Sequence, residues 1–193
     1  MHQLTLRMKW IMWIAAMCPA FLSAQSSSTE EPSHPVNWIT IEEALERCKT
    51  APRKIMIDVY TSWCGPCKML SKNTFADDEV SAFLNERFYC VKFNAESADT
   101  VRFDGKVFTN PGYDPAATGR NSVHEFTRFV GVSAYPTILF LDEQGKFLLP
   151  VSGYRTPPQI EIYLKLVADE HYKSITTTEE WQAWSAQFTP AWQ

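Results

Sequence analysis

One segment decides the fold of this chain, namely DVYTSWCGPCK at residues 58–68. It continues a short apolar run at 55–60, in which Asp58 is the only charged residue, and such a run is typical of a buried strand. Cys64 and Cys67 follow at once, and a helical pattern begins with them. The sequence therefore predicts that both cysteines lie where a strand turns into a helix.

Helical and strand patterns alternate on both sides of this segment. A first helix should follow a capping box of Thr40 and Glu43, and a second should run through Leu70 to Phe88 with a bend at Asp77 and Asp78. A short third helix should begin at a capping box of Ser122 and Glu125, and a fourth should begin at Thr156. The expected strands are 55–60, 89–93, 138–141 and 147–151, and the last two should form a hairpin. This order predicts an α/β domain with a central mixed sheet flanked by helices.

Two segments fall outside the regular pattern. Residues 95–121 contain three glycines and two prolines and show little periodicity, so we expect a long inserted loop. Residues 178–188 suggest a further helix with Trp181, Trp184 and Phe188 on one side. That helix either folds back on the domain or forms a surface for a partner, and a single apolar stripe favours the first interpretation.

The overall composition limits the classes of function. The chain has 193 residues and a net charge of −4, with acidic and basic residues mixed along its length. No basic stripe is present, which argues against nucleic acid as a partner. The sequence also lacks a phosphate loop, paired catalytic carboxylates and a cofactor box, so we expect no bound cofactor.

The start of the sequence has the pattern of a secretory signal. Arg7 and Lys9 precede an apolar run at 10–22, and Ser23-Ala24-Gln25 resembles a cleavage site. We therefore expect residues 1–24 to be a signal peptide for export, residues 25–37 a linker, and the compartment an oxidising one, such as the periplasm. An uncleaved signal would instead tether the protein to the membrane, although 13 apolar residues are short for a span.

A pair of cysteines at the start of a helix has a specific chemistry. Unpaired backbone N–H groups and the helix dipole stabilise a thiolate there and lower its pKa below the ordinary value of about 8.5. A structural zinc site would need two more ligands, and the sequence offers neither a second pair nor paired histidines, so we expect no metal. A purely structural disulfide would constrain only a very small ring. Cys48 and Cys90 fall on apolar patterns and should be buried.

The segment WCGPCK at 63–68 resembles the active site of thioredoxins, and the resemblance extends over residues 38–170. Several further positions carry it at matching intervals: Asp58, Lys92, Gly131, Tyr135-Pro136-Thr137 and Gly153. The resemblance implies a thioredoxin fold with an insertion at 95–121 before the cis-proline loop and a helical extension at 171–193. It also implies thiol–disulfide exchange with protein substrates.

The same resemblance implies a role for each matching residue. Cys64 would be the exposed nucleophile, and Cys67 would be the buried resolving thiol. Asp58 would exchange a proton with Cys67, and Lys92 would adjust this proton exchange. The alternative for Asp58 is a buried acid without a catalytic role, whose hydrogen bonds are satisfied within the fold. The residues expected to contact substrate are Trp63, Gly65, Pro66, Tyr135 and Pro136, the last in a cis peptide bond.

The direction of exchange is open. The Gly-Pro dipeptide resembles that of reducing thioredoxins, so we expect a periplasmic disulfide reductase that receives electrons from a membrane donor. The alternatives are a disulfide oxidase or isomerase, since the redox potential decides the direction. A binding module with an inactive pair is another alternative, against which the intact WCGPCK argues. The 95–121 loop should cover part of the site and narrow the choice of substrate.

Overall fold

The computed structural model describes residues 35–193 of the chain. The expected signal peptide at 1–24, and residues 25–34 of the expected linker, lie outside the described residues. None of the helices in the described part combines the length and apolar character needed to cross a membrane.

A five-stranded mixed sheet forms the centre of residues 35–193, with the strand order β1-β3-β2-β6-β7. Its strands are β1 (Trp38–Ile39), β2 (Lys54–Tyr60), β3 (Phe88–Asn94), β6 (Thr137–Leu141) and β7 (Phe147–Ser152). β3 runs parallel to both β1 and β2, whereas β6 is antiparallel to β2 and to β7. The mixed sheet with its terminal hairpin is as predicted, and only the short β1 was not foreseen.

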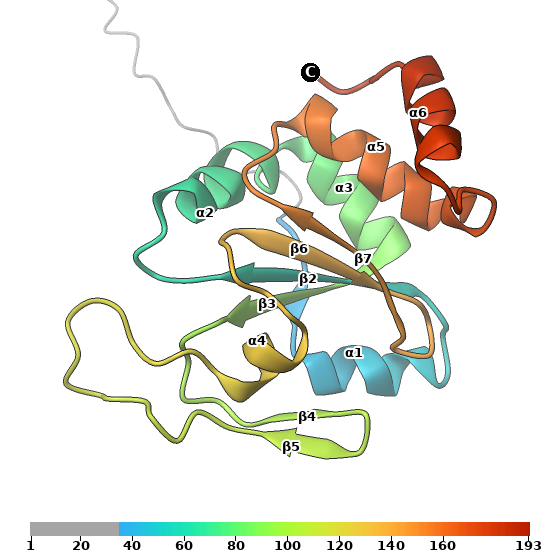
Figure 1. The fold of residues 1–193 in the computed structure, drawn as a ribbon. Helices are drawn as coiled ribbons and strands as arrows, with labels where there is room; N and C mark the ends of the chain where they lie inside the picture. Colours follow the sequence, from blue (N-terminus) through green and yellow to red (C-terminus); the bar gives the residue numbers. More distant parts are fainter. Residues whose placement is uncertain (1–34) are drawn as a thin grey trace, which may run out of the picture.

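Helices cover both faces of this sheet (Figure 1). The elements on one face are α1 (Ile41–Cys48), α4 (Glu125–Phe129) and a hairpin of β4 (Val101–Phe103) and β5 (Lys106–Phe108). The elements on the other are α2 (Gly65–Met69), the π-helical turn η1 (Leu70–Thr74), α3 (Asp78–Arg87) and α5 (Pro157–Ala168). The 3₁₀ turn η2 (His171–Lys173) and α6 (Thr178–Gln187) follow α5.

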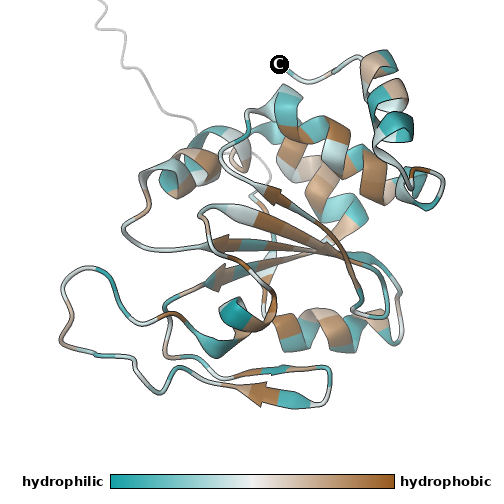
Figure 2. Cartoon of the chain, viewed as in Figure 1, coloured by the Kyte–Doolittle hydropathy of each residue, from teal (hydrophilic) through white to brown (hydrophobic). Residues whose placement is uncertain are grey.

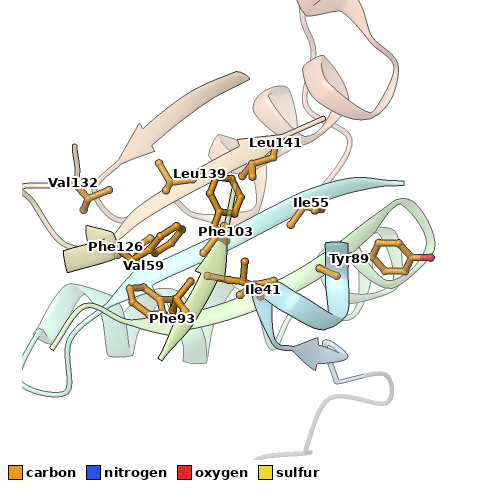
Figure 3. Packing of buried hydrophobic residues seen from close by; sticks show 14 of the residues in the cluster. Ile41, Ile55, Val59, Tyr89, Phe93, Phe103, Phe126, Val132, Leu139 and Leu141 are labelled. Atoms are coloured by element: carbon orange, nitrogen blue, oxygen red, sulfur yellow. The ribbon is translucent and has the colours of Figure 1, made fainter. Parts of the chain in front are cut away.

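The alternation of side chains along β2 explains why the sheet has two cores. Ile55, Ile57 and Val59 contribute to a cluster with Phe103 and Phe126 from the α1 side (Figure 3). Met56 points to the opposite face and belongs to a second cluster with residues of α3 and α5. Hydropathy colouring shows the apolar strands lying between these two layers (Figure 2). A strand covered on both faces is expected to be mostly apolar, which makes the buried Asp58 in the middle of β2 exceptional.

The insertion at 95–121 is more ordered than its composition suggested. Asp104 and Gly105 form the turn between β4 and β5, with φ values of 50° and 69°. Two successive residues with positive φ are the geometry of a tight hairpin turn, which Asp-Gly favours. Val101 and Phe103 on β4 are buried against the core. The prediction of a long loop was therefore wrong for this part of the insertion.

The predicted capping box of Ser122 and Glu125 was also wrong. The N-cap of α4 is His124, whose Nδ1 accepts the backbone N–H of Phe126 at 3.0 Å. Ser122 donates its hydroxyl to Asn110, and Glu125 accepts from the backbone and hydroxyl of Thr109. Contacts with the insertion thus replaced the local capping pattern, and the cap residue His124 is fully buried.

The C-terminal extension packs back on α5. The ring of Trp181 stacks on Tyr163 at 5.7 Å between centroids, and Trp184 packs against His171. The backbone N–H groups of Ala191 and Trp192 both donate to the carboxylate of Glu161 on α5. These contacts agree with the interpretation that the apolar stripe of α6 folds back on the domain.

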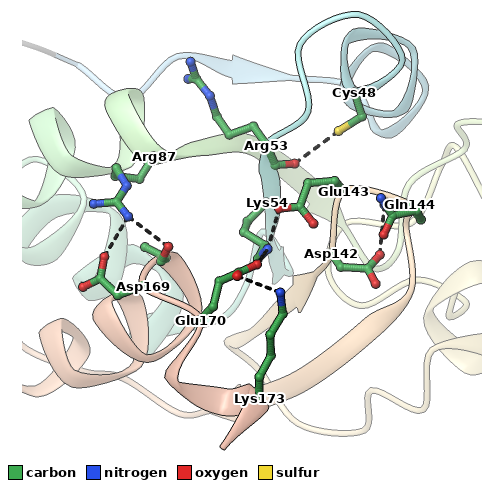
Figure 4. A network of polar contacts seen from close by, with 11 residues as sticks. Cys48, Arg53, Lys54, Arg87, Asp142, Glu143, Gln144, Asp169, Glu170 and Lys173 are labelled. Carbon is green, nitrogen blue, oxygen red and sulfur yellow. Dashed lines mark hydrogen bonds and ion pairs between the residues drawn. The ribbon is translucent and has the colours of Figure 1, made fainter.

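A buried lysine joins the far end of the sheet to this extension (Figure 4). Lys54, at the start of β2, pairs with Glu143 in the β6–β7 turn and with Glu170 after α5 at 2.8 Å. Lys173 pairs with the same Glu170 at 2.7 Å. The network connects three chain segments at the end of β2 opposite Cys64, so it is structural and separate from the cysteines.

Candidate active site

Cys64 and Cys67 form a disulfide at the start of α2. Cys64 is the N-cap residue, and its Sγ accepts the backbone N–H of Cys67 at 3.1 Å. Pro66 stands in the first turn, where the missing N–H of proline has no helical acceptor to lose. The strand-to-helix turn predicted from the sequence is therefore confirmed, and it places one sulfur against an unpaired helical N–H group.

The exposure expected of Cys64 was wrong for this disulfide form. Both cysteines are only 3% exposed, whereas Gly65 and Pro66 between them are exposed. The capping geometry turns the Cys64 side chain inward, toward the first turn of α2. The sulfur pair thus lies beneath an exposed Gly-Pro turn.

Asp58 is 1% exposed in β2, and within residues 35–193 neither of its carboxylate oxygens has a hydrogen-bond partner. Burial raises its pKa from the ordinary 3.8 to about 6, against the lowering influence of the Lys92 ammonium. A satisfied buried acid would have hydrogen-bond donors around it. Within the described residues Asp58 is instead a buried carboxyl group without such donors.

Lys92 lies directly opposite Asp58 in the register of β2 and β3, with its Nζ 4.0 Å from Oδ2. The same ammonium donates to Ser71 Oγ at 2.8 Å, within the π-helical turn. Lys92, Ser71 and Cys67 line one open cleft of about 450 Å³. The structure therefore brings the expected Cys67, Asp58 and Lys92 to one side of the turn.

The expected substrate-contact residues gather on the other side of the turn. Trp63 is 36% exposed, and its ring meets that of Tyr135 edge-to-face at 6.1 Å between centroids. The Tyr135–Pro136 peptide bond is cis, and the carbonyl of Pro136 accepts the N–H of Gly153. Because Trp63 precedes Cys64 directly, this contact places the Tyr135–Pro136 segment next to the cysteine turn.

Sequence reasoning missed two residues that attach the insertion to this site. The Oε2 atom of the buried Glu96 accepts the indole N–H of Trp63 at 2.8 Å and the backbone N–H of Asn121 at 3.0 Å. The guanidinium of Arg120 lies 4.1 Å from the centre of the Trp63 ring. These partners are 25 to 57 positions apart, so no local spacing could reveal them.

Comparison with known proteins gives a consistent result. The family described as "Thioredoxin-like domain" matches residues 41–168. The thiol:disulfide interchange protein DsbD of Escherichia coli K12 is 32% identical over 106 residues, or 55% of this chain and 14% of DsbD. DsbD of Citrobacter koseri is 33% identical over 105 residues, with 54% and 14% covered. The chain thus spans only about one seventh of the length of these relatives.

Solved structures show the same fold. A thioredoxin-fold protein from Helicobacter pylori superposes with a TM-score of 0.52 at 17% identity, covering 69% of this chain and 81% of the other. A thioredoxin from Thermus thermophilus gives 0.51 at 19% identity, with 69% and 87% covered. A candidate disulphide-isomerase from Bacteroides thetaiotaomicron gives 0.50 at 27% identity, with 71% and 94% covered.

Proposed function

The chain belongs to the thioredoxin-like family, and from this premise we propose that it is a thiol–disulfide oxidoreductase that reduces disulfides of other proteins in the periplasm. The observation that carries the proposal is the Cys64–Cys67 pair at the helix start, with Asp58 buried in the strand that leads to it. A reductase must cycle between this disulfide and a dithiol, and both states need controlled protonation.

The reaction consists of two exchanges. The Cys64 thiolate attacks one sulfur of the substrate disulfide, the substrate S–S bond breaks, and the other substrate sulfur leaves as a thiolate that takes up a proton. The Cys67 thiolate then attacks Cys64 Sγ in the mixed disulfide and releases the second substrate thiol. Two electrons pass from the protein to the substrate, and the Cys64–Cys67 disulfide forms.

Asp58 and Lys92 act on the second exchange in this proposal. Cys67 must lose its proton before it can attack, because only the thiolate is nucleophilic. Asp58, with a pKa of about 6, accepts that proton near neutral pH and returns it when the pair is reduced again. Lys92, 4.0 Å away, limits how far burial raises the Asp58 pKa.

The remaining site residues contact the substrate chain. Trp63, Gly65 and Pro66 form the exposed rim above the sulfurs. In this proposal the cis Pro136 faces the sulfurs, and the backbone of Tyr135 pairs with an extended substrate segment. We assign this work to a domain at 38–170, which includes the 95–121 insertion, and treat 171–193 as a supporting extension.

The reducing direction is supported by the Gly-Pro dipeptide between the cysteines, which resembles that of reducing thioredoxins. The similarity to DsbD, whose name describes thiol:disulfide interchange, supports exchange without giving its direction. A membrane electron donor would then restore the dithiol, and the signal-like pattern at 1–24 is the reason to place the exchange in the periplasm. The likeness to the candidate disulphide-isomerase favours isomerisation as the second candidate.

The reduction potential of the Cys64–Cys67 pair distinguishes these directions. Equilibration in dithiothreitol or glutathione buffers should give a value near that of thioredoxin, about −270 mV. A value near −180 mV would favour isomerisation, and one near −120 mV would make the protein a disulfide donor. A Cys67→Ser variant should accumulate a mixed disulfide through Cys64, whereas the matched Cys64→Ser variant should not.

A further inference from the structure

A second groove lies on the Trp63 side of the cysteine turn, away from the cleft that Cys67 and Lys92 line. Its volume is about 480 Å³, and its walls include Trp63, Tyr135 and the backbone segment at 132–134 that leads to the cis-proline. The insertion and α4 complete the walls with Arg120 and Arg128. An extended chain bound along Tyr135 would pass its side chains over this groove.

Arg120 is held in place on this wall. Its guanidinium lies over the Trp63 ring at 4.1 Å, which is the arrangement of a cation–π contact. The next residue, Asn121, donates its backbone N–H to Glu96 and forms two hydrogen bonds to the backbone of Asp114, at 2.9 and 2.7 Å. The loop is therefore closed on itself and anchored to the active-site tryptophan, so Arg120 is already positioned before a ligand arrives.

The groove has two guanidinium groups and one carboxylate among its lining residues. Glu96 is the carboxylate among the lining residues, and its Oε2 already accepts two N–H groups. Glu125, one turn before Arg128 on α4, accepts from Thr109 instead. Among the ion pairs within residues 35–193, none involves Arg120 or Arg128. A carboxylate brought by a ligand would find two unpaired guanidinium groups.

We propose that this groove binds an acidic segment of the substrate protein, beside the cysteine that reacts with Cys64. The inference rests on the proposed function, because the groove borders the rim where a substrate chain would lie. Guanidinium groups bind carboxylates with paired, charge-assisted hydrogen bonds, so Asp or Glu side chains fit best. Since an extended chain advances about 3.3 Å per residue, the acidic residue lies within a few positions of the substrate cysteine.

The test compares three disulfide-linked peptides that differ only in two residues next to the cysteine, which are acidic, neutral or basic. Single-turnover reduction by the full chain in its dithiol form should be about threefold to tenfold faster for the acidic than for the basic peptide, and the ratio should fall at high salt. The double variant Arg120→Glu with Arg128→Glu should invert this preference when the rates of the acidic and basic peptides are each taken relative to that of the neutral peptide.

Arg102→Glu is the matched control, because Arg102 is exposed on β4 of the same insertion and does not line the groove. It should keep the preference of the wild type. Equal rates for the acidic and basic peptides, or a preference that survives the double reversal, would overturn the inference. Failure to reduce even the neutral peptide would count against the proposed function alone.

A binding measurement tests the groove independently of the proposed reduction of disulfides. Titration of the acidic and basic peptides, with serine in place of their cysteine, into the oxidised full chain needs no turnover. The acidic peptide should bind more tightly and shift the NMR signals of Arg120 and of the Trp63 indole. Equal affinities, or shifts confined to other surfaces, would refute the groove even in a protein that exchanges disulfides.

Discussion

The Nζ atom of Lys92 lies 4.0 Å from Oδ2 of Asp58, opposite it in the register of two parallel strands. Burial raises the pKa of the Asp58 carboxyl, and the charge of Lys92 lowers it. The carboxyl oxygens have no hydrogen-bond partner in the described residues. The pair thus holds an acid in the core with a pKa of about 6. Because burial disfavours the ionised form of this carboxyl, Asp58 should lower the free energy of unfolding at neutral pH, and this effect can be measured.

The first prediction concerns Asp58→Asn. The folded pKa of about 6 exceeds the ordinary 3.8, so the folded protein binds this proton more tightly than the unfolded chain does. Stability is therefore lost as pH rises from about 4 to 6, by roughly 3 kcal/mol at most. Asn cannot ionise, so the oxidised variant should be more stable than wild type by about 1–3 kcal/mol at pH 7.5.

Urea unfolding at pH 7.5 and at pH 4 checks this prediction. At pH 4 the folded wild-type carboxyl is protonated and the unfolded one, with its ordinary pKa of 3.8, is only partly ionised, so the difference between the two proteins should fall below about 1 kcal/mol. A variant that is equally stable or less stable at pH 7.5 would show that Asp58 is stabilised by partners in solution.

The second prediction concerns Lys92→Met. Removal of a positive charge at 4.0 Å should raise the pKa of Asp58 above 6, by about 1–3 pH units, the range for a carboxyl next to one opposite charge. Carboxyl ¹³C NMR titration of the oxidised protein measures this value directly. Lys72→Met is the matched control, because Lys72 lines the same cleft without a contact to Asp58, and it should leave the titration unchanged.

The residues of this site also show which features of the structure could be predicted from the sequence. Asp58, Cys64 and Cys67 lie within ten positions, so the strand, the turn and the buried acid followed from local pattern. The β4–β5 hairpin also had a local signal, the Asp104-Gly105 pair between alternating apolar residues, which the glycines and prolines around it obscured. Glu96 had none, because the groups it binds are distant in the sequence and converge only after folding.

The third prediction concerns Glu96→Ala. The change removes the acceptor of two partly buried donors, the indole N–H of Trp63 and the backbone N–H of Asn121. We expect a loss of about 1–3 kcal/mol in stability, since hydrogen bonds to a charged acceptor contribute on this order. The loop that carries Arg120 should also become sensitive to limited proteolysis, and the Trp63 indole resonance should move.

Glu42→Ala is the control for this effect. Glu42 also binds the insertion, through the backbone N–H of Arg102 at 2.7 Å, but the contact is exposed. Its removal should change stability by less than about 1 kcal/mol and leave the Trp63 resonance in place. Similar results for the two variants would mean that Glu96 does not anchor the loop.

The fourth prediction concerns the C-terminal segment. Glu161 is fully buried on α5 and accepts from Lys165 at 2.5 Å, Ala191 N at 2.8 Å and Trp192 N at 3.0 Å. Burial alone would raise its pKa, but the Lys165 and backbone hydrogen bonds lower it below the ordinary value. The carboxylate therefore contributes stability above its unfolded pKa, and this contribution is lost as pH falls through the folded value.

Deletion of residues 189–193 removes two of the three donors to Glu161, together with the contact of Trp192 with Phe83. We expect the deletion to lower stability by about 2–4 kcal/mol at pH 7 and by less at pH 4, where the carboxylate of wild type is closer to protonation. Trp192→Ala keeps both backbone donors, so it should lose only the contacts of its ring with Phe83 and Lys165, about 1 kcal/mol at either pH. If the deletion and Trp192→Ala have equal effects at both pH values, the backbone donors do not stabilise Glu161, and the extension is held by its aromatic rings alone.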